Sequence, residues 1–196
     1  EAIETILEFA ELKKEGRIKK IIITGCLAER YKAEVSELIP EADAVVGLGC
    51  NKDIVKIIDR TLANENVQAF ESKLELPMTG MRVQTTLPFF SYLKIAEGCS
   101  NCCSYCAIPM IRGKFRSVPM EDLIKEAEYL VSHGVREINV IAQDSTRYGE
   151  DIYGESKLPE LLTELCRIEN LKWIRVLYCY PERVTDKLLD VIAKED

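Results

Sequence analysis

Four of the eight cysteines in this 196-residue chain lie within eight positions of one another. Cys99, Cys102, Cys103 and Cys106 occupy the stretch EGCSNCCSYC, and thiolates are soft ligands suited to zinc and to iron–sulfur clusters. We expect the chain to be cytoplasmic and reduced, because no secretory signal opens it. In such a protein a dense group of cysteines is more typical of a metal site than of disulfides.

The four cysteines can be divided in two ways. Two C-x2-C pairs, Cys99 with Cys102 and Cys103 with Cys106, would resemble the knuckles of a tetrahedral zinc site. Zinc ribbons separate such pairs by about a dozen residues, whereas Cys102 and Cys103 are neighbours that point in divergent directions. The alternative, C-x3-C-x2-C, uses Cys99, Cys103 and Cys106 and leaves Cys102 out. Three thiolates can bind three irons of a [4Fe–4S] cluster and leave the fourth iron open to a small molecule. The spacing favours this cluster, with a non-catalytic zinc-binding module as the alternative.

The elements around the cysteines indicate where they lie. A strand is predicted at residues 92–96, directly before them, and further strands at residues 138–142 and 173–178. A run of apolar residues at helical spacing follows each strand. Three consecutive βα units indicate a parallel sheet or part of a barrel, a fold whose active sites lie at the carboxyl ends of the strands.

The first third of the chain also alternates helical patterns, one of them running from after Cys26 up to Pro40, with short apolar strands, which predicts an α/β layer domain. Residues 63–88 lose this periodicity and contain two of the prolines and a glycine that mark loops, so we expect a linker there with one short strand. We therefore predict three parts: an α/β domain at residues 1–66, a linker at 67–88, and the βα units at 89–196.

The overall composition argues against several classes of protein. The 26 basic and 33 acidic residues give a net charge of −7, which argues against binding DNA through a broad basic face. No apolar run approaches the roughly 18–20 residues that span a bilayer, so no membrane association is expected. The chain begins with Glu1 inside a helical pattern, and we expect it to be a fragment of a longer protein.

The cysteine motif at a strand end resembles the radical S-adenosylmethionine (SAM) superfamily. In that superfamily the open iron chelates SAM, and an electron from the cluster cleaves the sulfonium to release a 5′-deoxyadenosyl radical. The stretch YLKIAEGC, Ile108-Pro109 and Arg112-Gly113 are similar to the methylthiotransferases. This resemblance implies a partial methylthiotransferase N-terminal domain, followed by the first βα units of an open radical SAM barrel of partial TIM type.

Two further stretches resemble one branch of that family. AQDSTRYG at residues 142–149 and LYCYP at residues 177–181 are similar to the RimO type, which methylthiolates the β-carbon of an aspartate in ribosomal protein S-12. The resemblance implies that a second cluster delivers sulfur, that another SAM supplies the methyl group, and that a reducing electron donor is needed. MiaB-type enzymes, which modify tRNA adenosine, usually carry different stretches at both places and are the alternative.

The resemblance also implies roles for single residues. Cys26 in TGCLAERY matches the family's third N-terminal cysteine and would be a ligand of a second [4Fe–4S] cluster, although a lone cysteine is more commonly a small buried residue. Its two partner cysteines are expected upstream of Glu1, so the ligand set is incomplete and the fragment alone is expected to be inactive. Gln143 or Asp144, at the end of the second strand, is expected to hydrogen-bond the amino group of SAM.

Overall fold

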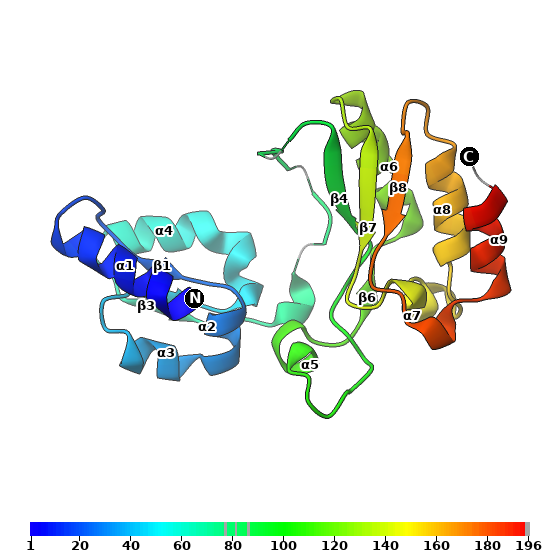
Figure 1. Cartoon of the computed structure of the whole chain (residues 1–196). Helices are drawn as coiled ribbons and strands as arrows, with labels where there is room; N and C mark the ends of the chain where they lie inside the picture. The colour runs from blue at the N-terminus through cyan, green and yellow to red at the C-terminus, as the bar shows by residue number, and fades with distance from the viewer. Residues whose placement is uncertain (77, 81, 86, 195–196) are drawn as a thin grey trace. The chain divides into compact units, whose positions relative to one another are not determined.

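The protein is described by a computed structural model, which covers residues 1–76, 78–80, 82–85 and 87–194 (Figure 1). The chain divides into two compact units, Glu1–Pro77 with Met110–Gly113, and Met78–Pro109 with Lys114–Asp196. Each unit combines helices with a sheet of three parallel strands. The predicted α/β class with parallel sheets is therefore confirmed. In the described part of the chain, no helix is both long and apolar enough to cross a membrane.

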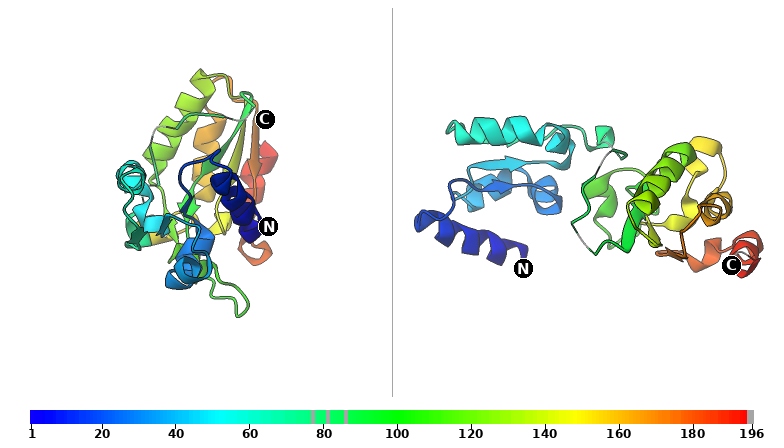
Figure 2. Two further views of the ribbon diagram at one scale, coloured as in Figure 1. Left: turned by 90° about the vertical axis from the view of Figure 1, so that its left-hand side faces the viewer. Right: turned by 90° about the horizontal axis from the view of Figure 1, so that it is seen from above.

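The sheet of the first unit is covered by helices on both faces. Its strands, in sheet order, are β1 (Ile22–Ile23), β2 (Ala44–Val46) and β3 (Val67–Ala69). Its helices are α1 (Ala2–Lys14), α2 (Cys26–Tyr31), α3 (Ala33–Leu38) and α4 (Ile54–Leu62), with short 3-10 helices at Leu48–Asp53 and Lys73–Glu75. Side chains of β2 alternate, so Val45 packs with α1, α2 and α3, whereas Ala44 and Val46 pack with α4. The right-hand view in Figure 2 shows α1 and α4 on opposite sides of this sheet.

A half-buried carboxylate joins α1 to the start of β2. Asp43 accepts hydrogen bonds from Lys13 at 2.5 Å, from the Ile21 backbone amide at 2.8 Å and from Lys20 at 3.0 Å. Burial alone would raise the pKa of Asp43, but these three hydrogen bonds outweigh it and hold the pKa below its ordinary value of 3.8. The ionised carboxylate therefore links the helix to the start of β2, the central strand of the sheet.

Two features of the first unit differ from the sequence-based expectation. One short strand was expected within the linker; it is β3 at residues 67–69, which pairs in parallel with β2 and so belongs to the sheet of the first unit. The strand is too short to show an alternating pattern, and its place is set by pairing with residues more than 20 positions earlier. In addition, the helical stretch before Pro40 is interrupted at Lys32, whose φ of +42° separates α2 from α3.

The second unit contains the three predicted βα strands, side by side in Figure 1. They are β4 (Phe90–Lys94), β7 (Glu137–Ile141) and β8 (Trp173–Val176), in that order, and each neighbouring pair is parallel. The predicted strands are confirmed with ends shifted by up to two residues. A small antiparallel sheet is formed by β5 (Ala96–Glu97) and β6 (Arg116–Ser117).

The core of the second unit lies between the three-stranded parallel sheet and the helices that follow its strands. The helices are α6 (Met120–Ser132), α7 (Glu150–Tyr153), α8 (Leu158–Cys166) and α9 (Asp186–Lys194). Helix α5 (Ile108–Arg112) contains residues of both units, because Pro109 belongs to the second and Met110–Arg112 to the first. Leu93, Ile138 and Val140 are fully buried against the apolar faces of α6 and α8. Each such side chain contributes about 1.5–3 kcal/mol by leaving water. The opposite face carries polar or exposed side chains, including Tyr92 and Lys94.

Candidate functional site

The cysteine loop begins where β5 ends. Gly98, with a φ of +75°, turns the chain into the loop, and Cys102 also has a positive φ of +50°. Cys99, Cys103 and Cys106 are half-buried, whereas Cys102 is exposed. Cys102 therefore differs in solvent exposure from the three cysteines of the C-x3-C-x2-C motif.

The loop contains its own hydrogen bonds to backbone and sulfur. The Cys106 amide donates to the Cys103 carbonyl at 3.0 Å, which closes a turn between two of the motif cysteines. The Ile108 amide lies 3.5 Å from Cys106 Sγ, and its N–H points at that sulfur. Amide donors to ligand sulfurs are among the contacts by which proteins tune iron–sulfur clusters.

The arrangement of the thiols can be compared with what each candidate metal needs. Within the described residues, no three histidine, cysteine, aspartate or glutamate side chains converge on a point that could hold one ion. A zinc–sulfur bond of about 2.3 Å places the sulfurs of one zinc ion only about 4 Å apart. A [4Fe–4S] cluster is larger and bonds each thiolate through a different iron, so its ligands lie farther apart. The loop offers soft sulfur donors of the kind that iron–sulfur clusters bind, and their assignment as cluster ligands stays a prediction.

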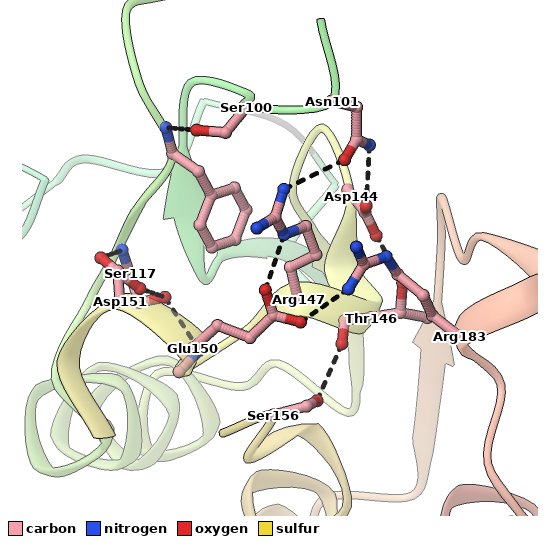
Figure 3. A network of polar contacts seen from close by, with 12 residues as sticks. Ser100, Asn101, Ser117, Asp144, Thr146, Arg147, Glu150, Asp151, Ser156 and Arg183 are labelled. Carbon is pink, nitrogen blue, oxygen red and sulfur yellow. Dashed lines mark hydrogen bonds and ion pairs between the residues drawn. The ribbon is translucent and has the colours of Figure 1, made fainter. Parts of the chain in front are cut away.

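A polar network ties the cysteine loop to the end of β7 (Figure 3). Asn101 donates from Nδ2 to Oδ2 of Asp144 at 2.9 Å, and Thr146 donates to the other oxygen of the same carboxylate. Asn101 Oδ1 also accepts a hydrogen bond from Arg147 at 3.1 Å. Asp144 is fully buried, so these donors supply the partners that a buried carboxylate requires. Asn101 thus holds the loop between the first two motif cysteines against the β7 end.

The same network reaches the segment after β8. Glu150 accepts from Arg147 at 2.8 Å and from Arg183 at 2.7 Å, as Figure 3 shows. Ser145 makes two further bonds, from its amide to the Tyr178 carbonyl at 2.9 Å and from its hydroxyl to the Leu177 carbonyl at 2.6 Å. The ends of two neighbouring strands and the cysteine loop are therefore held together.

The two residues expected to bind SAM lie in different environments. Gln143 is exposed, whereas Asp144 is enclosed and already engaged by the chain's own donors. Nearby Cys179 is half-buried, and burial, reinforced by the charge of Asp144, raises the pKa of its thiol. The role of Gln143 or Asp144 in SAM binding stays a prediction.

The sequence did not identify Asn101, Arg147, Glu150 and Arg183 as members of this site. Asn101 and Asp144 are 43 positions apart, and Glu150 and Arg183 are 33 apart. An arginine or asparagine in a loop is usually solvated, so residue type alone carries no signal for these pairs. The one available signal was the position of Asn101 inside the cysteine motif.

Cys26 lies in the first unit, as the first residue of α2 after Gly25, whose φ is +99°. Its thiol is exposed, in contrast to the buried apolar environment that is common for a lone cysteine. Arg112, one of the residues 110–113 that group with this unit, donates to Cys26 Sγ at 3.2 Å. The sulfur of Cys26 is thus solvent-accessible and already accepts a hydrogen bond from a charged donor.

Comparison with known proteins identifies the class of the chain. Residues 93–196 match the family model of the radical SAM superfamily, so the chain belongs to that superfamily. It is also similar to proteins named ribosomal protein uS12 methylthiotransferase RimO. The identity is 50% over 196 residues for Lachnoclostridium phytofermentans, 50% over 201 residues for Clostridioides difficile and 47% over 197 residues for Thermoanaerobacter sp.. Each alignment covers all of this chain but only 44%, 44% and 45% of the respective relative, so the chain spans less than half their length.

Proposed function

We propose that this chain is part of a radical SAM methylthiotransferase that modifies the β-carbon of an aspartate in ribosomal protein uS12, the protein called S-12 above. The observation that carries the proposal is the identity of 50% over the whole chain to a relative of that name. The cysteine loop, held against the ends of parallel strands, supports it from the structure. The expected location is the cytoplasm, where ribosomal proteins are made.

The ligands of the SAM-binding cluster are proposed to be Cys99, Cys103 and Cys106. Their half-buried thiols, the exposed Cys102 and the Ile108 amide aimed at Cys106 Sγ support this assignment. When bound, the [4Fe–4S] cluster would supply the electron that cleaves the sulfonium of SAM. The chain's own contribution is to hold three thiolates on one loop, and to fix that loop through Asn101.

The finer description of the fold also belongs to this proposal. Within the described residues of the second unit, the helices that pack on the three-stranded sheet join one buried core. A doubly wound sheet carries helices on both faces, whereas a barrel carries them only outside. This one-sided packing supports the first βα units of an open radical SAM barrel at residues 89–196. The preceding α/β part at residues 1–66 would be a portion of the methylthiotransferase N-terminal domain.

Gln143 and Asp144, the two polar residues after β7, would have different roles in binding SAM. Asp144 is engaged by Asn101 and Thr146, so we assign it to fixing the cysteine loop and the strand end. Gln143 has an exposed side chain directly beside it, with an amide that can accept a hydrogen bond from an ammonium group. Because the carboxylate of Asp144 is fully buried, we assign the direct contact with SAM to Gln143.

A second [4Fe–4S] cluster is proposed at Cys26. Its exposed thiol and its contact with Arg112 suit a ligand role. One thiolate is an incomplete set, so the other two ligands would come from the part of the longer protein that precedes Glu1. The 196-residue chain alone is then expected to lack methylthiotransferase activity, and the longer protein needs a reducing electron donor.

The test is an anaerobic assay of the longer protein with SAM and a reductant, in which uS12 and tRNA are supplied separately. Mass spectrometry of each product locates any added methylthio group. The proposal predicts modification of an aspartate in uS12 and none in tRNA. Modification of tRNA alone would refute the uS12 assignment and establish the MiaB-type reaction.

A further inference from the structure

The segment after β8 brings one phenol to the cysteine loop. The hydroxyl of Tyr180 lies 3.6 Å from Cys103 Sγ, which is hydrogen-bond distance for sulfur. The two residues are 77 positions apart, so this contact arises from the tertiary fold. Tyr180 is exposed, with 37% of its surface accessible to solvent, so what places it is the contacts of its segment.

Contacts on both sides hold Tyr180 in this place. On its N-terminal side, Ser145 bonds the carbonyls of Leu177 and Tyr178. On its C-terminal side, Arg183 donates to Glu150 at 2.7 Å. The segment is therefore held at two points, by Ser145 after β7 and by Glu150 on α7, and its backbone presents the phenol to the loop.

The direction of this hydrogen bond follows from the state of the sulfur. In the free chain either the thiol of Cys103 or the phenol of Tyr180 can donate. A cysteine bound to iron is a thiolate, which has no proton and can only accept. The phenol must then donate, and a donor to a ligand sulfur stabilises the more negative, reduced cluster.

We infer that Tyr180 is a positioning residue of the radical SAM site, which acts through Cys103 to make the cluster easier to reduce. This inference rests on the proposed function, because it requires a cluster on the cysteine loop. It adds a residue outside the cysteine motif, in the segment after β8, that helps to set the reduction potential at which SAM cleavage can begin.

The test measures that potential in the longer protein, reconstituted anaerobically with iron and sulfide. A Cys26→Ala background removes the proposed second cluster, so that one cluster is titrated. Reduction is followed by electron paramagnetic resonance against solution potential, with Tyr180→Phe as the variant. Tyr178→Phe is the matched control, because Tyr178 is a 62% exposed phenol on the same segment.

For Tyr180→Phe we expect an unchanged iron content and a threefold to tenfold smaller equilibrium constant for one-electron reduction. A tenfold change corresponds to a potential about 59 mV more negative. Tyr178→Phe should titrate like the parent. Tyr180→Leu, which removes ring and hydroxyl together, should match Tyr180→Phe, because only the hydroxyl acts on the sulfur.

The outcomes separate the two proposals. A parent protein without iron or sulfide would refute the cluster and the proposed function. A loaded cluster whose potential is unchanged in Tyr180→Phe, or lowered equally in Tyr178→Phe, would refute the role of Tyr180 alone. Loss of iron or of the far-ultraviolet circular dichroism in both Tyr180 variants would also refute it, because it would make the residue structural.

Discussion

Replacing Asn101 by alanine should weaken the second unit, although Asn101 is a half-buried loop residue. The change removes the Nδ2 donor to Asp144 at 2.9 Å and the Oδ1 acceptor of Arg147 at 3.1 Å. Arg147 keeps its bond to Glu150 at 2.8 Å, so its loss is small. Asp144 is fully buried and is left with Thr146 as its remaining side-chain donor in the described residues.

The expected magnitude follows from the charge and burial of Asp144. A hydrogen bond to a charged group contributes about 1.5–3 kcal/mol to stability. When a buried acceptor loses its donor, the loss of stability lies in the upper part of that range. We therefore expect Asn101→Ala to lower the free energy of unfolding by about 2–3 kcal/mol. Ser104, an exposed residue on the same loop, is the matched control, and Ser104→Ala should change it by less than about 0.5 kcal/mol.

The assay is urea unfolding of the metal-free chain, followed by tryptophan fluorescence. Trp173, the only tryptophan, lies on β8, so its signal reports on the second unit. A variant that unfolds at lower urea with the same slope has lost stability without a change in unfolded surface. Equal unfolding midpoints for Asn101→Ala and Ser104→Ala would show that the network does not stabilise the loop as argued.

Three further predictions concern the framework of the two units. Asp43→Asn should lower the free energy of unfolding by about 1–2 kcal/mol at neutral pH. The pKa of Asp43 is lower in the folded protein than the unfolded value of about 3.8. Its contribution to stability is therefore complete above pH 3.8 and is lost as the pH falls through the folded-state pKa. The stability of the variant should vary less with pH in that acidic range. Tyr148→Phe should cost about 1–2 kcal/mol in urea unfolding, because the fully buried hydroxyl donates to the Val118 carbonyl at 2.9 Å; an unchanged midpoint would contradict this. Lys32→Gly should raise the thermal midpoint, with a gain of about 1 kcal/mol from relief of the positive φ, and a lower midpoint would count against that reading.

Periodicity was sufficient to predict the layered parts of the fold. Ile138 and Val140 alternate with polar neighbours on β7, and the face of α6 that carries Leu123 and Leu130 repeats at helical spacing. These residues are fully or almost fully buried in one core. Local pattern and tertiary burial agree there, so the sequence alone was enough.

Local pattern failed where a residue's partners are distant or its conformation is unusual. Lys32 has a positive φ without being glycine or asparagine, so nothing in its type marks the break between α2 and α3. A short strand was expected near β3, but its three residues have no period, so its place beside β2 in the first sheet could not be predicted. The bond between Asn101 and Asp144 depends on how the cysteine loop returns to the β7 end, which no spacing rule specifies.

The candidate site shows the same division. The C-x3-C-x2-C spacing and the strand before it predicted which thiols differ from Cys102, and the structure gives Cys102 the more exposed position. The sequence could not predict the polar contacts around these thiols, because Arg147 and Arg183 meet Glu150 only in the folded chain. The superfamily was therefore easier to predict from the sequence than the contacts around the cysteine loop.

The central claim is that three cysteines of the loop hold a cluster and the fourth does not. Iron, sulfide and zinc analysis of the anaerobically purified longer protein tests it most directly, with Cys102→Ala and Cys103→Ala compared in the Cys26→Ala background. The account predicts about four irons and four sulfides in Cys102→Ala, as in its parent, and loss of both in Cys103→Ala. A colourless protein with one zinc, lost equally from both variants, would contradict it.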